Sequence, residues 1–351
     1  MEKQKRKKIF LNVAMAVILL FLVFIVFRKD YKAIWDCLSN TSVTGLLLLL
    51  GMGAGYQFLD SAVCLTLVRE KIPNFRFRQA ADIIFLGIFG NVLTSSAGTI
   101  PLQSYYLYGQ GVQVGNGAGM MIFVYIFHKT SVFFYAAVMV LLQRGWLKAT
   151  VPELMKYIYM VFVLCAIIIT ALVMLCTWNK IQEFLLWGIG KLPDTGKWTE
   201  RKALWSRNLE ALYKESRHIL GNRSCRRKII FFDLIKLSWL YLIPFVCIKI
   251  LNIPGPALRR TFVLASIMIV IVGILPNVSG IGSAEFAFLL VFEPYMERVS
   301  ASSAMILYRI VTYFFPFVLS VGVFLKIRKN MLGVGKTAAV REAASHAGGG
   351  K

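Results

Sequence analysis

Residues 272–291 read VGILPNVSGIGSAEFAFLLV, and residues 89–108 read FGNVLTSSAGTIPLQSYYLY. In each stretch an apolar run reaches a segment rich in Gly, Ser or Pro, and a second apolar run follows. The apolar run before each interruption is shorter than the roughly 20 residues that a membrane-spanning helix needs. Irregular backbone at membrane depth is tolerated only where protein covers it or where it lines a wet cavity. The two interruptions therefore predict broken helices that line a site inside a membrane protein.

The composition of the whole chain agrees with this interpretation. Hydrophobic residues make up 58% of the 351 residues, charged residues only 16%, and the mean hydropathy is +0.66. These values exclude an ordinary soluble domain. The formal net charge of +23 would suggest nucleic acid as the partner of a soluble protein. In a membrane protein the same excess first indicates orientation, because Lys and Arg are retained on the cytoplasmic side.

Six apolar runs are long enough to span a bilayer. They cover residues 9–27, 43–68, 119–142, 157–177, 229–251 and 303–325. Two further runs, 80–93 and 261–275, are shorter and lead into the interruptions. We therefore predict an all-α, polytopic integral membrane helix bundle of about eight segments. The two Gly- and Pro-broken segments either cross the membrane or re-enter it.

Basic residues gather in four segments: the N-terminus, the residues after the second span, the loop 178–228, and the residues after the last span. All four should be cytoplasmic, as should both termini. The stretches 80–142 and 261–325 must then each make one net crossing, in opposite directions. Together with their similar patterns, this predicts an inverted-topology repeat, as in many transporters. The expected organisation is a cytoplasmic N-terminus at 1–8, a membrane domain at 9–326 and a cytoplasmic tail at 327–351.

Ionisable groups inside spans cost roughly 2.5 to 3.5 kcal/mol each on insertion scales, so they usually mark function. Lys129, Glu285 and Arg309 lie deep in the apolar runs or beside the interruptions. Further polar residues complete the predicted binding site, namely Gln103, Tyr105, Tyr106, His128, Asn277 and Ser279. For His128, an alternative is a packed side chain in an aromatic-rich helix. The helices that restart after the interruptions offer free amides, which suit a phosphate or carboxylate group.

Other features have plainer interpretations. Asp82, Asp233 and Lys236 lie within a turn or two of the predicted membrane interface, which indicates snorkelling or helix-end roles. The glycine-rich stretch 109–119 is interpreted as a flexible connector. The sequence shows no Ser/His/Asp set, no CxxC pair and no histidine-rich cluster, and it therefore predicts no catalytic residue, metal or cofactor.

The loop 178–228 is the only sizeable soluble segment that the sequence predicts. Several apolar positions in it follow a helical period: Leu204, Trp205, Leu209, Leu212, Tyr213 and Ile219. They predict an amphipathic helix that lies on the inner leaflet, where basic charge is attracted by anionic lipid. RNA binding is the weaker alternative, because the loop is too small to form a domain with its own core.

The segments 91–112, 279–292 and 304–316 read NVLTSSAGTIPLQSYYLYGQGV, SGIGSAEFAFLLVF and AMILYRIVTYFFP. They resemble the membrane domain of the lysylphosphatidylglycerol synthase/flippase family, the multiple-peptide-resistance-factor type. The resemblance extends from about residue 9 to residue 326. The chain departs from the family pattern in its first turn, AGTIPLQ, which is less rich in Gly. It also carries His128 and Lys129 where many relatives have an acidic and a basic residue.

The resemblance implies a lipid-handling domain in the plasma membrane of a bacterium. Full-length members move aminoacylated phosphatidylglycerol to the outer leaflet, which reduces the attraction of cationic antimicrobial peptides. They also carry a cytosolic acyltransferase-like domain that uses lysyl-tRNA. Because the sequence ends 25 residues after Lys326, we expect that domain to be absent.

The primary functional hypothesis is a translocase for an anionic or aminoacylated phospholipid such as lysyl-phosphatidylglycerol. Arg309 and Lys129 would hold the anionic headgroup, while Glu285 would pair with a cation on the lipid or with Arg309. The first alternative is a phosphatidylglycerol lysyltransferase, for which tRNA would be a partner. The second alternative is a membrane scaffold that recruits a separate synthase through the basic loop.

Overall fold

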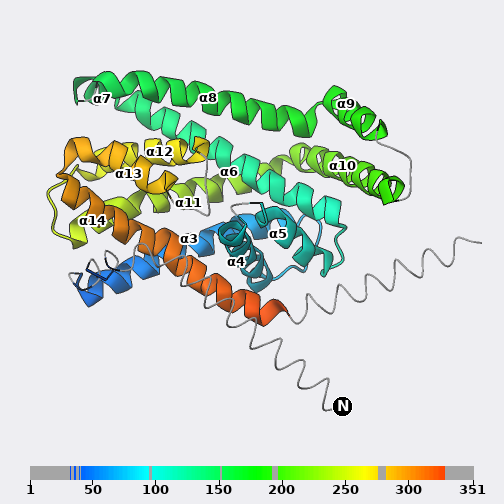
Figure 1. Ribbon diagram of the computed structural model, residues 1–351, viewed down its shortest axis with the longest axis horizontal. Helices are drawn as coiled ribbons and strands as arrows, with labels where there is room; N and C mark the ends of the chain where they lie inside the picture. Colours follow the sequence, from blue (N-terminus) through cyan, green and yellow to red (C-terminus); the bar gives the residue numbers. More distant parts are fainter. Residues whose placement is uncertain are drawn as a thin grey trace, which may run out of the picture.

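The computed structural model describes residues 32, 35, 36, 39, 41–94, 97–150, 152–191, 197–275 and 282–328. Within these residues the chain is helical and contains no strand (Figure 1), so the predicted all-α class is confirmed. The predicted first span, 9–27, lies outside the described residues.

Five long apolar helices form the body of the bundle. They are α3 (Val43–Val68), α6 (Val114–Leu142), α8 (Pro152–Thr177), α11 (Arg223–Ile250) and a last helix that runs from Arg298 to Arg328. Each is long and apolar enough to cross a membrane, and each matches one predicted span. The last helix comprises α14 (Arg298–Arg309), a π-helical turn η2 (Ile310–Phe314) and a further α-helical part. The chain is therefore a multi-pass membrane protein.

The first broken segment folds into a helical hairpin of α4 (Phe77–Leu93) and α5 (Thr99–Tyr108). The two helices are antiparallel, because Gln103 Nε2 donates to the carbonyl of Ile83 at 3.3 Å and Gln79 bonds Gln110 at 2.8 Å. Near the tip, a Cβ on Gly90 would lie only 2.6 Å from the carbonyl oxygen of Gly98, so this close approach requires glycine. The segment consequently re-enters and returns to the end of the bundle from which it came.

The second broken segment forms the hairpin of α12 (Leu258–Ile274) and α13 (Ser283–Phe292). The guanidinium of Arg260, at the start of α12, and the ring of Tyr295, just after α13, both contact Trp146 in α7 (Arg144–Thr150). Both ends of this hairpin therefore lie beside α7, at the end of the molecule opposite to α5, α9 and α10 (Figure 1). The two hairpins enter the bundle from opposite ends, which is the arrangement that the predicted inverted repeat requires.

One end of the bundle carries the loop 69–76, α9 (Asn179–Gly190), α10 (Lys197–Gly221) and residues 326–328; we call it the basic end. The predicted amphipathic helix is present as α10. Its Tyr213 and Ile219 are buried within the protein, whereas Leu204 and Trp205 are exposed.

The glycine-rich stretch 109–119 was predicted to be a flexible connector, and that prediction is wrong from residue 114 onward. Helix α6 begins at Val114, and its glycines allow close packing. A Cβ on Gly115 would lie 3.0 Å from Cα of Asn208 in α10, and a Cβ on Gly117 would lie 3.4 Å from Cα of Ser104 in α5. Tertiary contacts thus order a segment whose composition suggests flexibility.

Candidate functional site

A buried ion pair joins the second hairpin to the last helix. Glu285, in the first turn of α13, accepts a hydrogen bond from the backbone N–H of Gly282 at 2.7 Å. Its other carboxylate oxygen lies 2.7 Å from Nε of Arg309. The Arg309 side chain is 6% exposed and that of Glu285 is 24% exposed, so the pair is accessible mainly through the carboxylate. Gly282 has φ +94°, a left-handed conformation that glycine adopts readily and that allows α13 to begin there.

Arg309 lies where the last helix changes from α to π geometry. Its guanidinium is 4.0 Å from the centre of the Tyr313 ring, within the π-helical turn. Such turns occur frequently at functional sites. Arg309 Nη2 is buried and has no hydrogen-bond partner among the described residues. A guanidinium with a free donor suits a phosphate or carboxylate oxygen. The predicted neighbours Asn277 and Ser279 lie outside the described residues.

Four ionisable residues from three helices form a second constellation, which we call the buried cluster: Asp60 on α3, His128 on α6, and Asp233 and Lys236 on α11. Lys236 Nζ lies 2.8 Å from Asp60 Oδ1 and 2.6 Å from Asp233 Oδ1. His128 Nδ1 lies 3.2 Å from the same Asp233 oxygen. The Lys236 ammonium occupies the space between the carboxylates. No group of three potential metal ligands is found in the described parts of the chain.

The interface roles predicted for Asp233 and Lys236 are wrong. Asp233 is fully buried and Lys236 is 1% exposed. The apolar run begins at residue 229, but α11 already begins at Arg223, so Lys236 lies in the middle of the helix. The buried ammonium of Lys236 requires a partner of opposite charge, and Asp60 on a different span supplies it.

Lys129 follows His128 in sequence but lies in different surroundings. A Cβ on Gly273, in the last turn of α12, would lie 3.2 Å from Lys129 Nζ. The ammonium also lies 5.3 Å from the centre of the Tyr125 ring. The C-terminal end of a helix carries partial negative charge that favours a cation. Lys129 is thus placed beside the interruption between α12 and α13.

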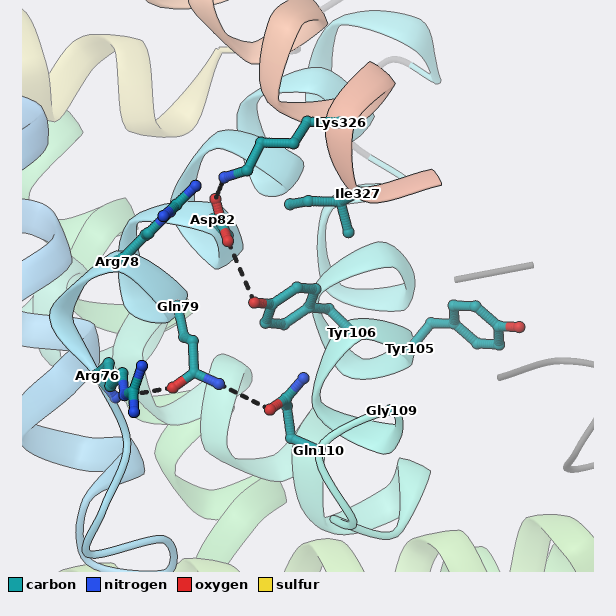
Figure 2. Close-up of a pocket in the computed structure, with 10 residues that line it drawn as sticks. All are labelled: Arg76, Arg78, Gln79, Asp82, Tyr105, Tyr106, Gly109, Gln110, Lys326 and Ile327. Atoms are coloured by element: carbon teal, nitrogen blue, oxygen red, sulfur yellow. Dashed lines mark hydrogen bonds and ion pairs between the residues drawn. The ribbon is translucent and has the colours of Figure 1, made fainter. Parts of the chain in front are cut away.

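A cavity of about 540 Å³ opens at the basic end, beside the first hairpin (Figure 2). Its lining is rich in hydrogen-bonding and basic side chains: Arg76, Arg78, Gln79, Asp82, Tyr105, Tyr106, Gly109, Gln110, Lys326 and Ile327. Asp82, which was predicted to snorkel or to have a helix-end role, is mostly buried. It accepts a hydrogen bond from Tyr106 at 3.3 Å and lies 3.5 Å from Lys326 Nζ. Figure 2 shows Arg78 pointing toward this pair and the ring of Tyr105 pointing away from it.

The residues predicted to share one site are therefore distributed over several places. The structure brings Glu285 and Arg309 together and puts Tyr105 and Tyr106 at the basic cavity. Gln103 is buried inside the first hairpin, against Gly87. Asp60, Asp233 and Lys236 were not predicted to belong to the site. The sequence does carry a signal for these three residues. Asp60 is the lone acid within the apolar run 43–68, and Asp233 and Lys236 are an acid and a base three residues apart within the run 229–251.

The geometry agrees with the comparison of the sequence with known families. The sequence profile of the family described as "Lysylphosphatidylglycerol synthase TM region" matches residues 9–320. None of the curated proteins matches the chain. The family match includes both hairpins, the pair Glu285 and Arg309, and the buried cluster. The chain therefore belongs to the lysylphosphatidylglycerol synthase transmembrane-region family.

Proposed function

We propose that the protein is a lipid translocase that binds an anionic or aminoacylated phospholipid, such as lysyl-phosphatidylglycerol, and moves it between leaflets. Residues 9–326 are the lipid-handling domain in this proposal. The basic end faces the cytoplasm of a bacterial cell, because its Lys and Arg residues are retained there.

The single observation that carries the proposal is the pair Glu285 and Arg309. A lysylated phospholipid headgroup carries a phosphate anion and ammonium groups. A guanidinium binds phosphate, and a carboxylate binds ammonium, so the separated pair offers a complementary partner for each charge. The pair lies at a helix restart beside a π-helical turn, where backbone groups are also available to a ligand.

The basic cavity supports the same function from the other side of the bundle. Arg76, Arg78 and Lys326 line it with positive charge, while Asp82 supplies one carboxylate. An anionic headgroup of the leaflet at this end is attracted to such a lining. The cavity and the pair Glu285 and Arg309 belong to hairpins that enter from opposite ends. We assign the cavity to the leaflet at the basic end, and the pair Glu285 and Arg309 to the opposite leaflet.

Purified protein in vesicles tests the proposal. Fluorescently labelled phosphatidylglycerol, lysyl-phosphatidylglycerol and phosphatidylcholine are incorporated, and leaflet exchange is followed by quenching from outside. The protein should accelerate exchange of the first two lipids over empty vesicles, and Glu285→Gln should abolish the acceleration. Equal exchange in empty and protein-containing vesicles for every anionic and lysylated lipid would refute the proposal.

The lysyltransferase alternative is decided by a different measurement. The chain is expressed in a host that lacks lysylated lipid, and total lipids are analysed by mass spectrometry. The translocase proposal expects no new lysyl-phosphatidylglycerol. Its appearance, together with incorporation of labelled lysine from lysyl-tRNA by purified protein, would establish the enzyme instead.

One observation favours the scaffold alternative. Trp198, Leu204 and Trp205 are exposed on α10, with exposures of 39%, 52% and 42%. Deleting α10 is an unsuitable test, because Tyr213 and Ile219 are buried in the protein. The double variant Leu204→Ser/Trp205→Ser leaves that packing in place. A scaffold would lose a co-purifying synthase on this change, whereas a translocase would keep its exchange rate.

A further inference from the structure

The buried cluster lies at mid-height of the bundle. His128 is fourteen residues from each end of α6, and Lys236 is thirteen and fourteen residues from the ends of α11. At 1.5 Å per residue this depth is roughly 20 Å from either end. The proposed lipid-binding pair Glu285 and Arg309 does not account for these residues, so their charges require a separate role.

The charges of the buried cluster do not balance without an added proton. Asp60 and Asp233 contribute two negative charges and Lys236 contributes one positive charge. With a neutral imidazole on His128 the cluster carries one net negative charge, and with a protonated imidazole it carries none. Net charge inside a membrane is costly. One added proton therefore brings the cluster to neutrality.

The contacts of His128 indicate which of its ring nitrogens is available for that proton. His128 Nδ1 lies 3.2 Å from the Asp233 carboxylate, which accepts a hydrogen bond, so Nδ1 holds a proton in the neutral ring. The remaining nitrogen, Nε2, is the basic atom. The His128 side chain is 22% exposed, whereas that of Asp233 is fully buried, so His128 is the accessible member of the two. Asp233 Oδ2 is buried and has no hydrogen-bond partner in the described chain, which leaves acceptor capacity beside the ring.

The charged groups that interact with His128 are Lys129 on α6 itself and Asp233 and Lys236 on α11. These groups have titratable neighbours of their own: Tyr56 and Asp60 on α3 beside Lys236, Cys165 on α8 beside Lys129, and Tyr241 on α11 beside Asp233. Among the residues that the structure describes, only Asp233 contacts the imidazole within ion-pair distance. The nearest other cation on α6, Lys129, lies beside Gly273 and forms no ion pair with a described carboxylate.

We infer that the buried cluster binds one exchangeable proton on His128 and couples the proposed lipid movement to proton movement. The coupling rests on the proposed function, whereas the proton site does not. His128 and Lys236 contact the same oxygen of Asp233, so an imidazolium competes with the ammonium for it. This competition shifts Lys236 toward Asp60 and strengthens the contact of α6 with α11. Because Lys129 lies beside the last turn of α12, the change in α6 reaches the second hairpin and Glu285.

The proton site is tested without any lipid measurement. The chain has three histidines, so His218→Gln/His346→Gln leaves His128 as the only one. Histidine-labelled protein in lipid nanodiscs is titrated by NMR between about pH 5 and pH 9, around the ordinary histidine range. The imidazole signal should shift reversibly with one proton, and Asp233→Asn should change the midpoint. A signal that stays constant over this range would overturn the proton site.

Coupling is tested in vesicles with a pH gradient and a membrane potential clamped by valinomycin and potassium. One pH unit is a tenfold ratio of proton activity. With one proton per lipid, the wild type should shift the steady-state leaflet ratio of labelled lipid by up to about tenfold. His128→Gln should remove the shift, and the matched control His218→Gln, on the exposed surface of α10, should retain it.

The outcomes separate the two proposals. Wild-type exchange that ignores the gradient, or a His128→Gln variant that responds like the wild type, would refute coupling while leaving the translocase intact. A protein that moves no lipid under any condition would refute the translocase and the coupling together. The NMR titration then decides the proton site alone.

Discussion

Arg309 contacts a carboxylate with one edge of its guanidinium and an aromatic ring with its face. A lysine has a compact ammonium with no planar surface, so it cannot preserve both contacts from the same backbone position. The distinction makes Arg309 a specific residue in the proposed mechanism and not merely a positive charge in an apolar bundle. The same argument does not apply to Arg298, whose side chain is 83% exposed beside Glu293.

Arg309→Lys should lower the vesicle exchange rate at least about tenfold, which corresponds to about 1.4 kcal/mol, because either the ion pair or the ring contact is lost. Membrane insertion should be unchanged, as judged by size-exclusion chromatography of the extracted protein. Arg298→Lys is the matched control and should exchange lipid at the wild-type rate. An Arg309→Lys protein with wild-type exchange would contradict the assigned role.

Lys236 forms ion pairs with two carboxylates, Asp60 and Asp233, and balances one of their two negative charges. Lys236→Met should therefore destabilise the protein by about 3 to 5 kcal/mol, measured by thermal unfolding in detergent. The triple variant Asp60→Asn/Asp233→Asn/Lys236→Met should recover much of the loss, because it removes the charges together. Lys249→Met, at the exposed end of α11, is the control. Equal stability of Lys236→Met and the wild type would show that the carboxylates are solvated or protonated.

The sequence predicts the pair Glu285 and Arg309 better than it predicts the buried cluster. Glu285 lies beside the visible interruption and Arg309 lies within the last apolar run, and their pairing was one of the two partnerships predicted for Glu285. The buried cluster could not be assembled from sequence, because Asp60 and Lys236 are 176 residues apart. The pattern of apolar and charged residues along one sequence does not predict which spans pack together. Asn277 and Ser279 remain predictions.

At the scale of elements, the two hairpins define the fold. Their first helices are only 17 residues long, while α6 contains 29. A helix of 17 residues is about 26 Å long, somewhat less than the roughly 30 Å hydrocarbon core of a bilayer. The hairpins therefore bring polar backbone and side chains into the bundle without crossing it. In the first hairpin this depends on close contact between the two helices at Gly90 and Gly87.

Gly90→Ala should disrupt the first hairpin. The new Cβ would meet the backbone oxygen of Gly98, which cannot move aside as a flexible side chain does. We expect a loss of about 1 to 3 kcal/mol in unfolding free energy and reduced lipid exchange. Gly51→Ala is the control, because a Cβ on Gly51 meets nothing within 4 Å. If the two variants unfold at the same temperature, the close contact at the hairpin tip is not required.

Spans were more predictable than their ends. The run 43–68 has the same bounds as α3, because its apolar residues fill the helix from end to end. Helices α6 and α11 begin five and six residues before their predicted spans, since glycine-rich or basic turns extend them beyond the apolar run. Helices α7 and α9 were not predicted. They are short, and their sequences lack the long apolar period that reveals a span.

At the scale of the whole molecule, the positions of the basic segments agree with the predicted number of membrane crossings. The loop 69–76, α9, α10 and the C-terminal end of the last helix gather at one end, and α7 and residues 251–257 lie at the other (Figure 1). Lys71 pairs with Glu215, and Asn222 bonds Glu70, so the basic loops are joined to one another. This arrangement supports the parity of crossings predicted from sequence. Because Lys and Arg are retained on the cytoplasmic side, we expect the basic end to be cytoplasmic and the α7 end to be external.

Cysteine accessibility tests that assignment. Leu204→Cys on α10 and Glu297→Cys beside α14 are exposed positions at opposite ends. A membrane-impermeant maleimide should label Glu297→Cys in intact cells and should label Leu204→Cys only after permeabilisation. The unsubstituted chain gives the background from its own six cysteines. The reverse labelling pattern would place the basic end outside.

The bond between Lys236 and Asp60 also has a consequence for biosynthesis. Asp60 is made 176 residues before its partner. At about 5 to 20 residues per second, the ribosome takes roughly 9 to 35 s to reach Lys236. During that interval Asp60 lacks the ammonium that pairs with it in the folded bundle, and an unpaired charge in hydrocarbon is costly. The arrival of α11 supplies that partner, so the order of translation determines when the centre of the bundle can assemble.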